Sequence, residues 1–205
     1  MPIISDIKRQ KRSQDRFSLY VDGKYSFSLG DLALSNSGLR VGHVLNAAEV
    51  EHWQSQALEA KAYFAALGQL SYRRRSRREL ADYLSRKDYD EDIADAVLSR
   101  LESLGLVDDA AFAAAWIADR QLLRPRSTRT LFGELRQKGI ATEIINDSLT
   151  VIDESSELNV LTDLIERKRR QSAFADPQKL MGFLARQGYA YDRIKKALAR
   201  LDGLD

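Results

Sequence analysis

Apolar residues recur in the same order in three stretches of the chain, residues 76–101, 127–152 and 176–201. Successive copies are offset by 51 and 49 residues. Four aligned apolar positions hold in every copy: Leu80, Leu131 and Leu180; Leu84, Leu135 and Leu184; Leu98, Leu149 and Leu198; and Leu101, Ile152 and Leu201. A fixed period of about 50 residues is typical of a repeated supersecondary unit. The pattern therefore predicts tandem helical modules.

Polar residues mark where the helices of each copy begin and end. The copies open at Ser76, Ser127 and Asp176, residue types whose side chains accept hydrogen bonds from the free N–H groups at a helix start. Glu79 completes a capping box with Ser76, and Pro177 occupies a first helical position. The following turns lie at Lys87-Asp88, Lys138-Gly139 and Gln187-Gly188. Glycine in two of these turns favours a left-handed helix end.

A longer helix is predicted before each of these pairs. The first runs over residues 46–70 from a cap at Asn46, the second over 109–123, and the third opens near Ser155 or Ser156. Each module therefore has three helices, with predicted boundaries 46–104, 105–153 and 154–205. A single such module can bury little apolar surface by itself, so neighbouring modules are expected to pack into an elongated, slightly curved array.

Residues 1–45 follow a different period. Apolar and polar residues alternate over 17–21 and 25–29, on either side of Asp22-Gly23. This is the pattern of a β-hairpin with a two-residue turn, and residues 3–10 can supply a third strand. The fold class expected is mainly α, with three tandem three-helix repeats behind a small β-rich N-terminal unit.

The net charge of +2 conceals a strong segregation of charge. Acidic residues dominate from Asp88 to Asp119, and basic residues dominate from Arg120 to Lys138. Such patterning favours a polyanion on one surface and a basic protein patch on another, although solvated helix faces account for most charge runs. The candidate contact residues are Arg73, Arg74, Arg75, Arg77, Arg78, Arg120, Arg124, Arg126, Arg129, Lys138, Arg167, Lys168, Arg169 and Arg170.

Several classes of protein are disfavoured by the composition. The chain has no cysteine, which excludes disulfides and thiolate metal sites and favours a reducing cytoplasm. No apolar run is long enough to cross a bilayer, and no signal-peptide core opens the chain. A soluble, cytoplasmic protein without a membrane partner is expected.

No convincing catalytic set is present, so we expect no enzyme activity, cofactor or metal. His43 and His52 lack further ligands at metal spacing. Glu59-Ala60-Lys61 and Glu166-Arg167-Lys168 match half of a nuclease signature, but both lie in helical sequence and the motif is common by chance. Asp109 is better explained as a helix cap than as half of a metal-binding pair.

The second repeat carries an aromatic pair, Phe112 and Trp116, one helical turn apart. Both residues fall on the apolar stripe of the predicted helix 109–123. We therefore assign them to the core rather than to a platform for stacking bases.

Three motifs, taken together and in this order, resemble the RecX family, whose members regulate the RecA recombinase. They are Arg75-Ser76 with Glu79-Leu80 and Leu84; residues 105–109 with Phe112-Ala113 and Arg120; and residues 134–140. The resemblance covers about residues 55–201, and residues 1–45 look like the extra segment of longer members. Asp88 is a departure, because a glycine usually follows the lysine there.

The resemblance implies a non-catalytic regulator that lies in the helical groove of the RecA–DNA filament and restrains ATP hydrolysis, filament growth and strand exchange. Its implied setting is recombination, repair and the SOS response. The implied partners are RecA and single- or double-stranded DNA, held nonspecifically through phosphates, and a monomer is the simplest expectation. A free-standing nonspecific DNA-binding protein and a metal-dependent nuclease are the alternatives.

Overall fold

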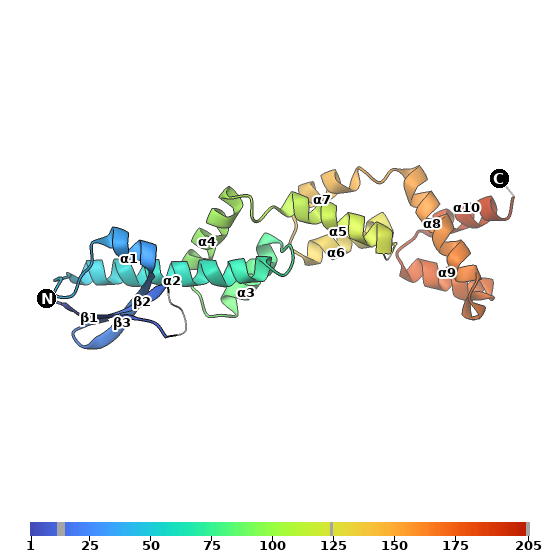
Figure 1. Cartoon of the computed structure of the whole chain (residues 1–205). Coiled ribbons are helices and arrows are strands. Elements are labelled where there is room, and N and C mark those ends of the chain that lie inside the picture. Colours follow the sequence, from blue (N-terminus) through green and yellow to red (C-terminus); the bar gives the residue numbers. More distant parts are fainter. Residues whose placement is uncertain (12–14, 124, 204–205) are drawn as a thin grey trace. The chain divides into compact units, whose positions relative to one another are not determined.

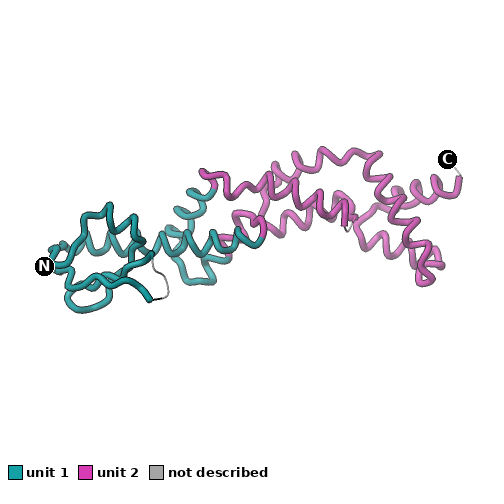
Figure 2. Tube along the Cα trace, viewed as in Figure 1, with its two compact units in different colours: residues 1–72, 83–101 teal, residues 73–82, 102–205 magenta. Residues whose placement is uncertain are grey.

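The computed structural model describes residues 1–11, 15–123 and 125–203 of the chain. Within these residues it has three β-strands, ten α-helices and one short 3-10 helix (Figure 1). The chain divides into two compact units, residues 1–72 with 83–101 and residues 73–82 with 102–205 (Figure 2). The division falls within α3 (Arg77–Ser85) and near the end of α4 (Glu91–Ser103).

The predicted N-terminal sheet is confirmed. β1 (Ile4–Arg9), β2 (Arg16–Val21) and β3 (Lys24–Gly30) pair antiparallel in the order β1-β2-β3. The β2–β3 turn has φ values of 49° at Asp22 and 80° at Gly23. Left-handed conformations at both central residues give a hairpin turn whose twist matches that of the strands, which explains why Asp-Gly stands there.

The sheet packs on helices of the same unit. α1 (Asp31–Ser37) follows β3 directly, and α2 (Ala47–Leu70) opens with a capping box between Asn46 and Glu49. Residues of the sheet, the following loop and α2 form one apolar cluster: Ile4, Leu19, Phe27, Leu29, Leu39, Leu45 and Ala57. The first unit therefore combines the sheet with α2, the helix that also begins the first repeat.

The four repeated apolar positions are buried completely in the first repeat, where Leu80, Leu84, Leu98 and Leu101 are each 0% exposed. Asp88, at the turn between the helices of this pair, has a φ of 58° and an exposed side chain. The first turn therefore adopts the left-handed conformation without glycine, because aspartate tolerates this region better than most residues.

The second repeat consists of α5 (Asp109–Leu123), α6 (Thr128–Gln137) and α7 (Thr142–Leu149). Its core is formed by Phe112, Ala113, Ile117, Leu131, Leu135, Ile140 and Ile145. Phe112 lies in this core as predicted, and Trp116 packs against it with the ring centroids 5.8 Å apart. The predicted cap differs, since the Asp108 carboxylate accepts from the Ala111 N–H at 2.9 Å, while Asp109 has another partner described below.

The third repeat consists of α8 (Glu154–Arg169), the 3-10 helix η1 (Ser172–Phe174), α9 (Pro177–Arg186) and α10 (Tyr191–Leu201). Its core includes Leu158, Leu161, Leu164, Ile165, Leu180, Leu184, Tyr189, Ile194 and Ala197. α8 begins slightly earlier than predicted, because the Asp153 carboxylate accepts from the Ser156 N–H at 2.6 Å and caps the helix. The capping of α9 by Asp176 is as predicted.

Candidate nucleic-acid interface

Ser76 joins the start of α3 to the end of α6. Its hydroxyl donates to the carbonyl oxygen of Lys138 at 2.7 Å and accepts from the Glu79 N–H at 3.1 Å. The side chain is completely buried. Ser76 therefore caps its own helix, as predicted, and at the same time satisfies a carbonyl left free at a helix end in the next repeat.

The same junction recurs one repeat later. Ser127, at the start of α6, accepts from the Thr130 N–H at 3.2 Å, and the Thr130 hydroxyl donates to the carbonyl oxygen of Gln187 at 2.8 Å. Gln187 ends α9, just as Lys138 ends α6. The repeat in the sequence is therefore also a repeat of the contact that joins successive modules.

An acidic residue of the following repeat completes each junction. Asp109 accepts from the backbone N–H of Arg77 at 2.9 Å, and Glu157 accepts from both the N–H and the hydroxyl of Thr128 at 2.9 Å. These donors belong to the first helical turn, where N–H groups lack intrahelical partners. Burial raises the pKa of Asp109, and the hydrogen bond from Arg77 partly opposes this change.

Glycine is required where two modules meet. Gly139 and Gly188 have φ values of 78° and 89°. A Cβ added at Gly139 would meet the side chain of Arg78, and one added at Gly188 would meet Ser127 and Thr130. Asp88 occupies the equivalent turn of the first repeat, which no earlier repeat precedes, and this explains why the glycine can be absent there.

Glu79 lies at the centre of the first junction. Its two carboxylate oxygens accept from the two terminal guanidinium nitrogens of Arg73, each at 2.9 Å, and Lys138 Nζ donates to it at 2.6 Å. Burial raises the pKa of Glu79, but the hydrogen bonds from these two cations outweigh burial and lower the pKa from 4.5 to about 2. The ion pair between Glu79 and Lys138 links two residues that are 59 positions apart in the chain.

This pKa predicts acid sensitivity of the second unit. A carboxylate whose pKa is lower in the folded than in the unfolded chain stabilises the fold above the unfolded value and loses that effect as the pH falls towards the folded value. We expect Glu79 to contribute roughly 2 kcal/mol at neutral pH, lost between about pH 4.5 and pH 2. Asp109, whose pKa is raised, acts in the opposite direction. Urea unfolding of wild type and Glu79→Gln at pH 7 and pH 3 measures the contribution.

The difference in unfolding free energy between wild type and Glu79→Gln should shrink at the lower pH. Asp82→Asn, which changes an exposed carboxylate on the same helix, is the control for general surface charge. An unchanged difference between the two pH values would contradict the assignment of Glu79.

Many of the predicted contact cations are engaged in ion pairs. Arg120 lies 2.8 Å from Glu134 and 4.1 Å from the centroid of the Trp116 ring, and the Trp116 indole donates to the same carboxylate. The other pairs join Arg73 and Lys138 to Glu79, Arg77 to Glu102 at 3.1 Å, Arg78 to Asp82 at 3.8 Å, Arg126 to Glu134 at 3.9 Å and Arg169 to Asp202 at 2.8 Å. Sequence position alone did not separate these structural cations from the rest.

Four of the predicted cations are exposed, and their guanidinium groups have no partner within residues 1–11, 15–123 and 125–203. They are Arg74, Arg129, Arg167 and Arg170. Arg75 is half-buried next to Ser76, and Lys168 contacts the Gln171 side chain at 3.4 Å. Arg124 lies outside the described residues.

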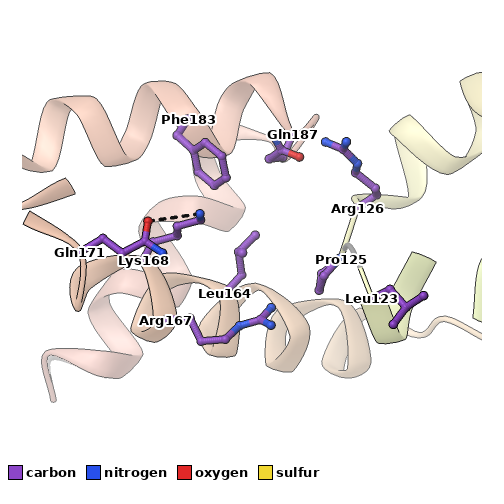
Figure 3. Close-up of a pocket in the computed structure, with 9 residues that line it drawn as sticks. All are labelled: Leu123, Pro125, Arg126, Leu164, Arg167, Lys168, Gln171, Phe183 and Gln187. Atoms are coloured by element: carbon purple, nitrogen blue, oxygen red, sulfur yellow. Dashed lines mark hydrogen bonds between the residues drawn. The ribbon is translucent and has the colours of Figure 1, made fainter. Parts of the chain in front are cut away.

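A cavity of about 310 Å³ lies between the α5–α6 connection and the helices α8 and α9, inside the second unit (Figure 3). Three predicted cations, Arg126, Arg167 and Lys168, surround it. Its apolar lining comes from Leu123, Pro125, Leu164 and Phe183, and two amides, Gln171 and Gln187, lie among them. No carboxylate lines this cavity in the part of the chain that the structure describes.

The described residues hold no group of three or more histidine, cysteine, aspartate or glutamate side chains arranged to bind a metal ion. Glu59 and Glu166, the acids of the two nuclease-like motifs, lie on the helices α2 and α8. Across the same residues, no helix has the length and apolar character needed to span a membrane.

Family models match three parts of the chain. The RecX N-terminal domain of the regulatory protein matches residues 2–46, the first three-helix domain of RecX matches 62–101, and the second matches 108–149. The match at 2–46 extends the similarity beyond residues 55–201 to the sheet.

Curated relatives match along nearly the whole chain. Regulatory protein RecX of Halalkalibacterium halodurans is 32% identical, covering 97% of this chain and 78% of the relative. The corresponding values for RecX of Levilactobacillus brevis are 32%, 98% and 77%. A crystal structure of regulatory protein RecX, 28% identical, superimposes with a TM-score of 0.72 over 96% of this chain and 100% of its own. The similarity therefore includes sequence and fold together.

Proposed function

Because the chain belongs to the RecX family of regulatory proteins, we propose that it binds the RecA–DNA filament in its helical groove and restrains ATP hydrolysis, filament growth and strand exchange by RecA. In this proposal the protein is a cytoplasmic monomer that acts by binding and has no chemistry or cofactor of its own. Its modules, residues 46–104, 105–153 and 154–205, contact more than one RecA subunit.

The observation that carries the proposal is the set of exposed guanidinium groups that have no partner among the described residues, Arg74, Arg129, Arg167 and Arg170. Such a group can bind a phosphate or a carboxylate without first breaking an ion pair, and arginine does so with two parallel hydrogen bonds. Contacts of this kind neutralise phosphates without reading the DNA sequence. A protein that acts along a filament formed on DNA of any sequence needs this type of contact.

The repeated junctions support a multivalent mode of binding. Arg74 precedes the junction at Ser76, and Arg129 follows the junction at Ser127 by two residues. Because the junctions tie successive repeats together through hydrogen bonds, the cations of the second unit are presented on a continuous framework. Binding at one module then raises the effective concentration of the next, so weak individual contacts add up to tight binding.

The test is a titration of this protein into RecA that is hydrolysing ATP on single-stranded DNA. We expect inhibition at well below one protein per RecA, because a protein bound in the groove acts on a filament of many subunits. Unchanged hydrolysis, together with tight and salt-sensitive binding to DNA alone, would replace the proposal by a free-standing DNA-binding protein. Loss of labelled DNA during incubation with magnesium or manganese would favour the nuclease instead.

A further inference from the structure

We propose that the cavity between the α5–α6 connection and α8–α9 binds one nucleotide of single-stranded DNA, with its phosphate between Arg126 and Arg167 and its base against Leu164 and Phe183. This proposal rests on the proposed function for the identity of the polyanion. It goes beyond the proposed function in two ways. It assigns a DNA contact to the place where the second and third repeats meet, and it requires the bound DNA to be single-stranded.

The electrostatics of the cavity select a phosphate. Arg167 is exposed and has no partner among the described residues. The Arg126 side chain is half-buried, and its Nε lies 3.9 Å from the Glu134 carboxylate, too far for a hydrogen bond. Figure 3 shows Arg126 on the α5–α6 connection and Arg167 on α8, on two sides of the cavity that both residues line. With no acid among the lining residues, an anion placed between them gains charge-assisted hydrogen bonds from both.

The remaining lining selects an unpaired base. Phe183 points into the cavity beside Leu164 (Figure 3), and Lys168 Nζ lies 5.0 Å from the centroid of the Phe183 ring. An aromatic ring with adjacent cations is the surface on which single-stranded DNA stacks its bases. The amides of Gln171 and Gln187 can both donate to and accept from a base edge. Bases inside a duplex are stacked and cannot enter such a cavity.

The deciding experiment compares two arginines of the third repeat. Arg167 and Arg186 are both exposed and without partners in the described residues, but only Arg167 lines the cavity, and Arg186 is not one of the predicted contact residues. Binding of the full chain to a fluorescent oligo(dT) of about 20 nucleotides is measured against salt. We expect Arg167→Ala to weaken binding about tenfold and to reduce the salt slope by about 0.7, and Arg186→Ala to change affinity by about twofold or less.

A second comparison isolates the base. Wild type should bind oligo(dT) about tenfold more tightly than an abasic strand of the same length, because stacking is absent from the abasic strand. Phe183→Leu keeps an apolar side chain but removes the ring, so it should abolish most of this preference and leave the salt slope unchanged. Circular dichroism checks that each variant is folded.

Three outcomes would overturn the inference. The first is an equal effect of Arg167→Ala and Arg186→Ala, and the second is equal binding of oligo(dT) and the abasic strand. The third is displacement of oligo(dT) by an acidic peptide, if Arg167→Ala weakens binding of the peptide more than binding of oligo(dT). The last would assign the cavity to a protein partner. If one of these results is obtained and the protein still inhibits RecA, the proposed function stands and only the cavity assignment fails. If DNA binding depends on the cavity but RecA is not inhibited, the cavity assignment stands and the proposed function fails.

Discussion

Replacing Gly139 by alanine is expected to lower the free energy of unfolding by about 3 kcal/mol, with two physical causes. The first is the left-handed backbone conformation, φ 78°, which costs a residue with a Cβ roughly 1–2 kcal/mol. The second is the approach of the neighbouring repeat, since the new methyl group would overlap the side chain of Arg78, beginning at its Cβ. A Cβ cannot swing away as the end of a flexible chain can, so the junction must shift, at a cost of about 1–3 kcal/mol.

Gly105→Ala separates these two causes. Gly105 belongs to the same unit and has a similar φ of 66°, but a Cβ there would meet nothing within 4 Å. We expect this variant to lose only the backbone contribution, about 1 kcal/mol. Both values are measured by urea unfolding, followed by circular dichroism. Equal losses in the two variants would mean that the close contact between the repeats in this junction does not contribute to stability.

The local elements of the fold could be predicted from the sequence because their causes are local. The alternation around Asp22-Gly23 and the side chains of Ser76, Ser127 and Asp176 act on the backbone within a few residues of themselves. The structure has the hairpin and these caps where the pattern placed them. The role of each of these residues in its own turn could therefore be predicted from spacing alone.

The junctions could not be predicted, because one residue there serves two partners. Ser76 explains its own helix start completely, so nothing in the sequence indicates the second bond to Lys138, 62 residues away. Asp109 shows the same problem in reverse. It is a good capping residue by type, but Asp108 caps the helix and leaves Asp109 to bind Arg77, 32 residues earlier. The one signal in the sequence of a close contact between repeats is the difference among the three turns, which have glycine at 139 and 188 but aspartate at 88.

The candidate site was only partly visible in the sequence for a related reason. A run of basic residues shows that cations are present, but the acid that neutralises each one is chosen by the fold. Arg169 pairs with Asp202, 33 residues later, whereas Arg167 and Arg170, which flank it in the same run, have no partner in the described residues. Phe183 and Gln187, which complete the cavity, come from the third repeat and carry no charge that marks them as contact residues.

This division of the cations predicts the largest functional effect. A variant that reverses Arg74, Arg129, Arg167 and Arg170 to glutamate is expected to need roughly a hundredfold more protein for half-maximal inhibition of RecA ATP hydrolysis. Each reversal removes a charge-assisted contact and adds repulsion from the polyanion. None of the four guanidinium groups has a partner in the part of the chain described, so the thermal unfolding midpoint should stay close to that of wild type.

The matched control reverses four exposed cations outside the candidate set, Lys24, Arg40, Arg86 and Lys87. Both quadruple variants carry the same net charge, so any difference between them reports the position of the charges rather than their sum. We expect the control to inhibit RecA within a few-fold of wild type, because none of its four cations belongs to the proposed contact surface. Equal loss of inhibition in the two variants would reduce the role of the four arginines to net charge, and retained inhibition in both would exclude them from the interface.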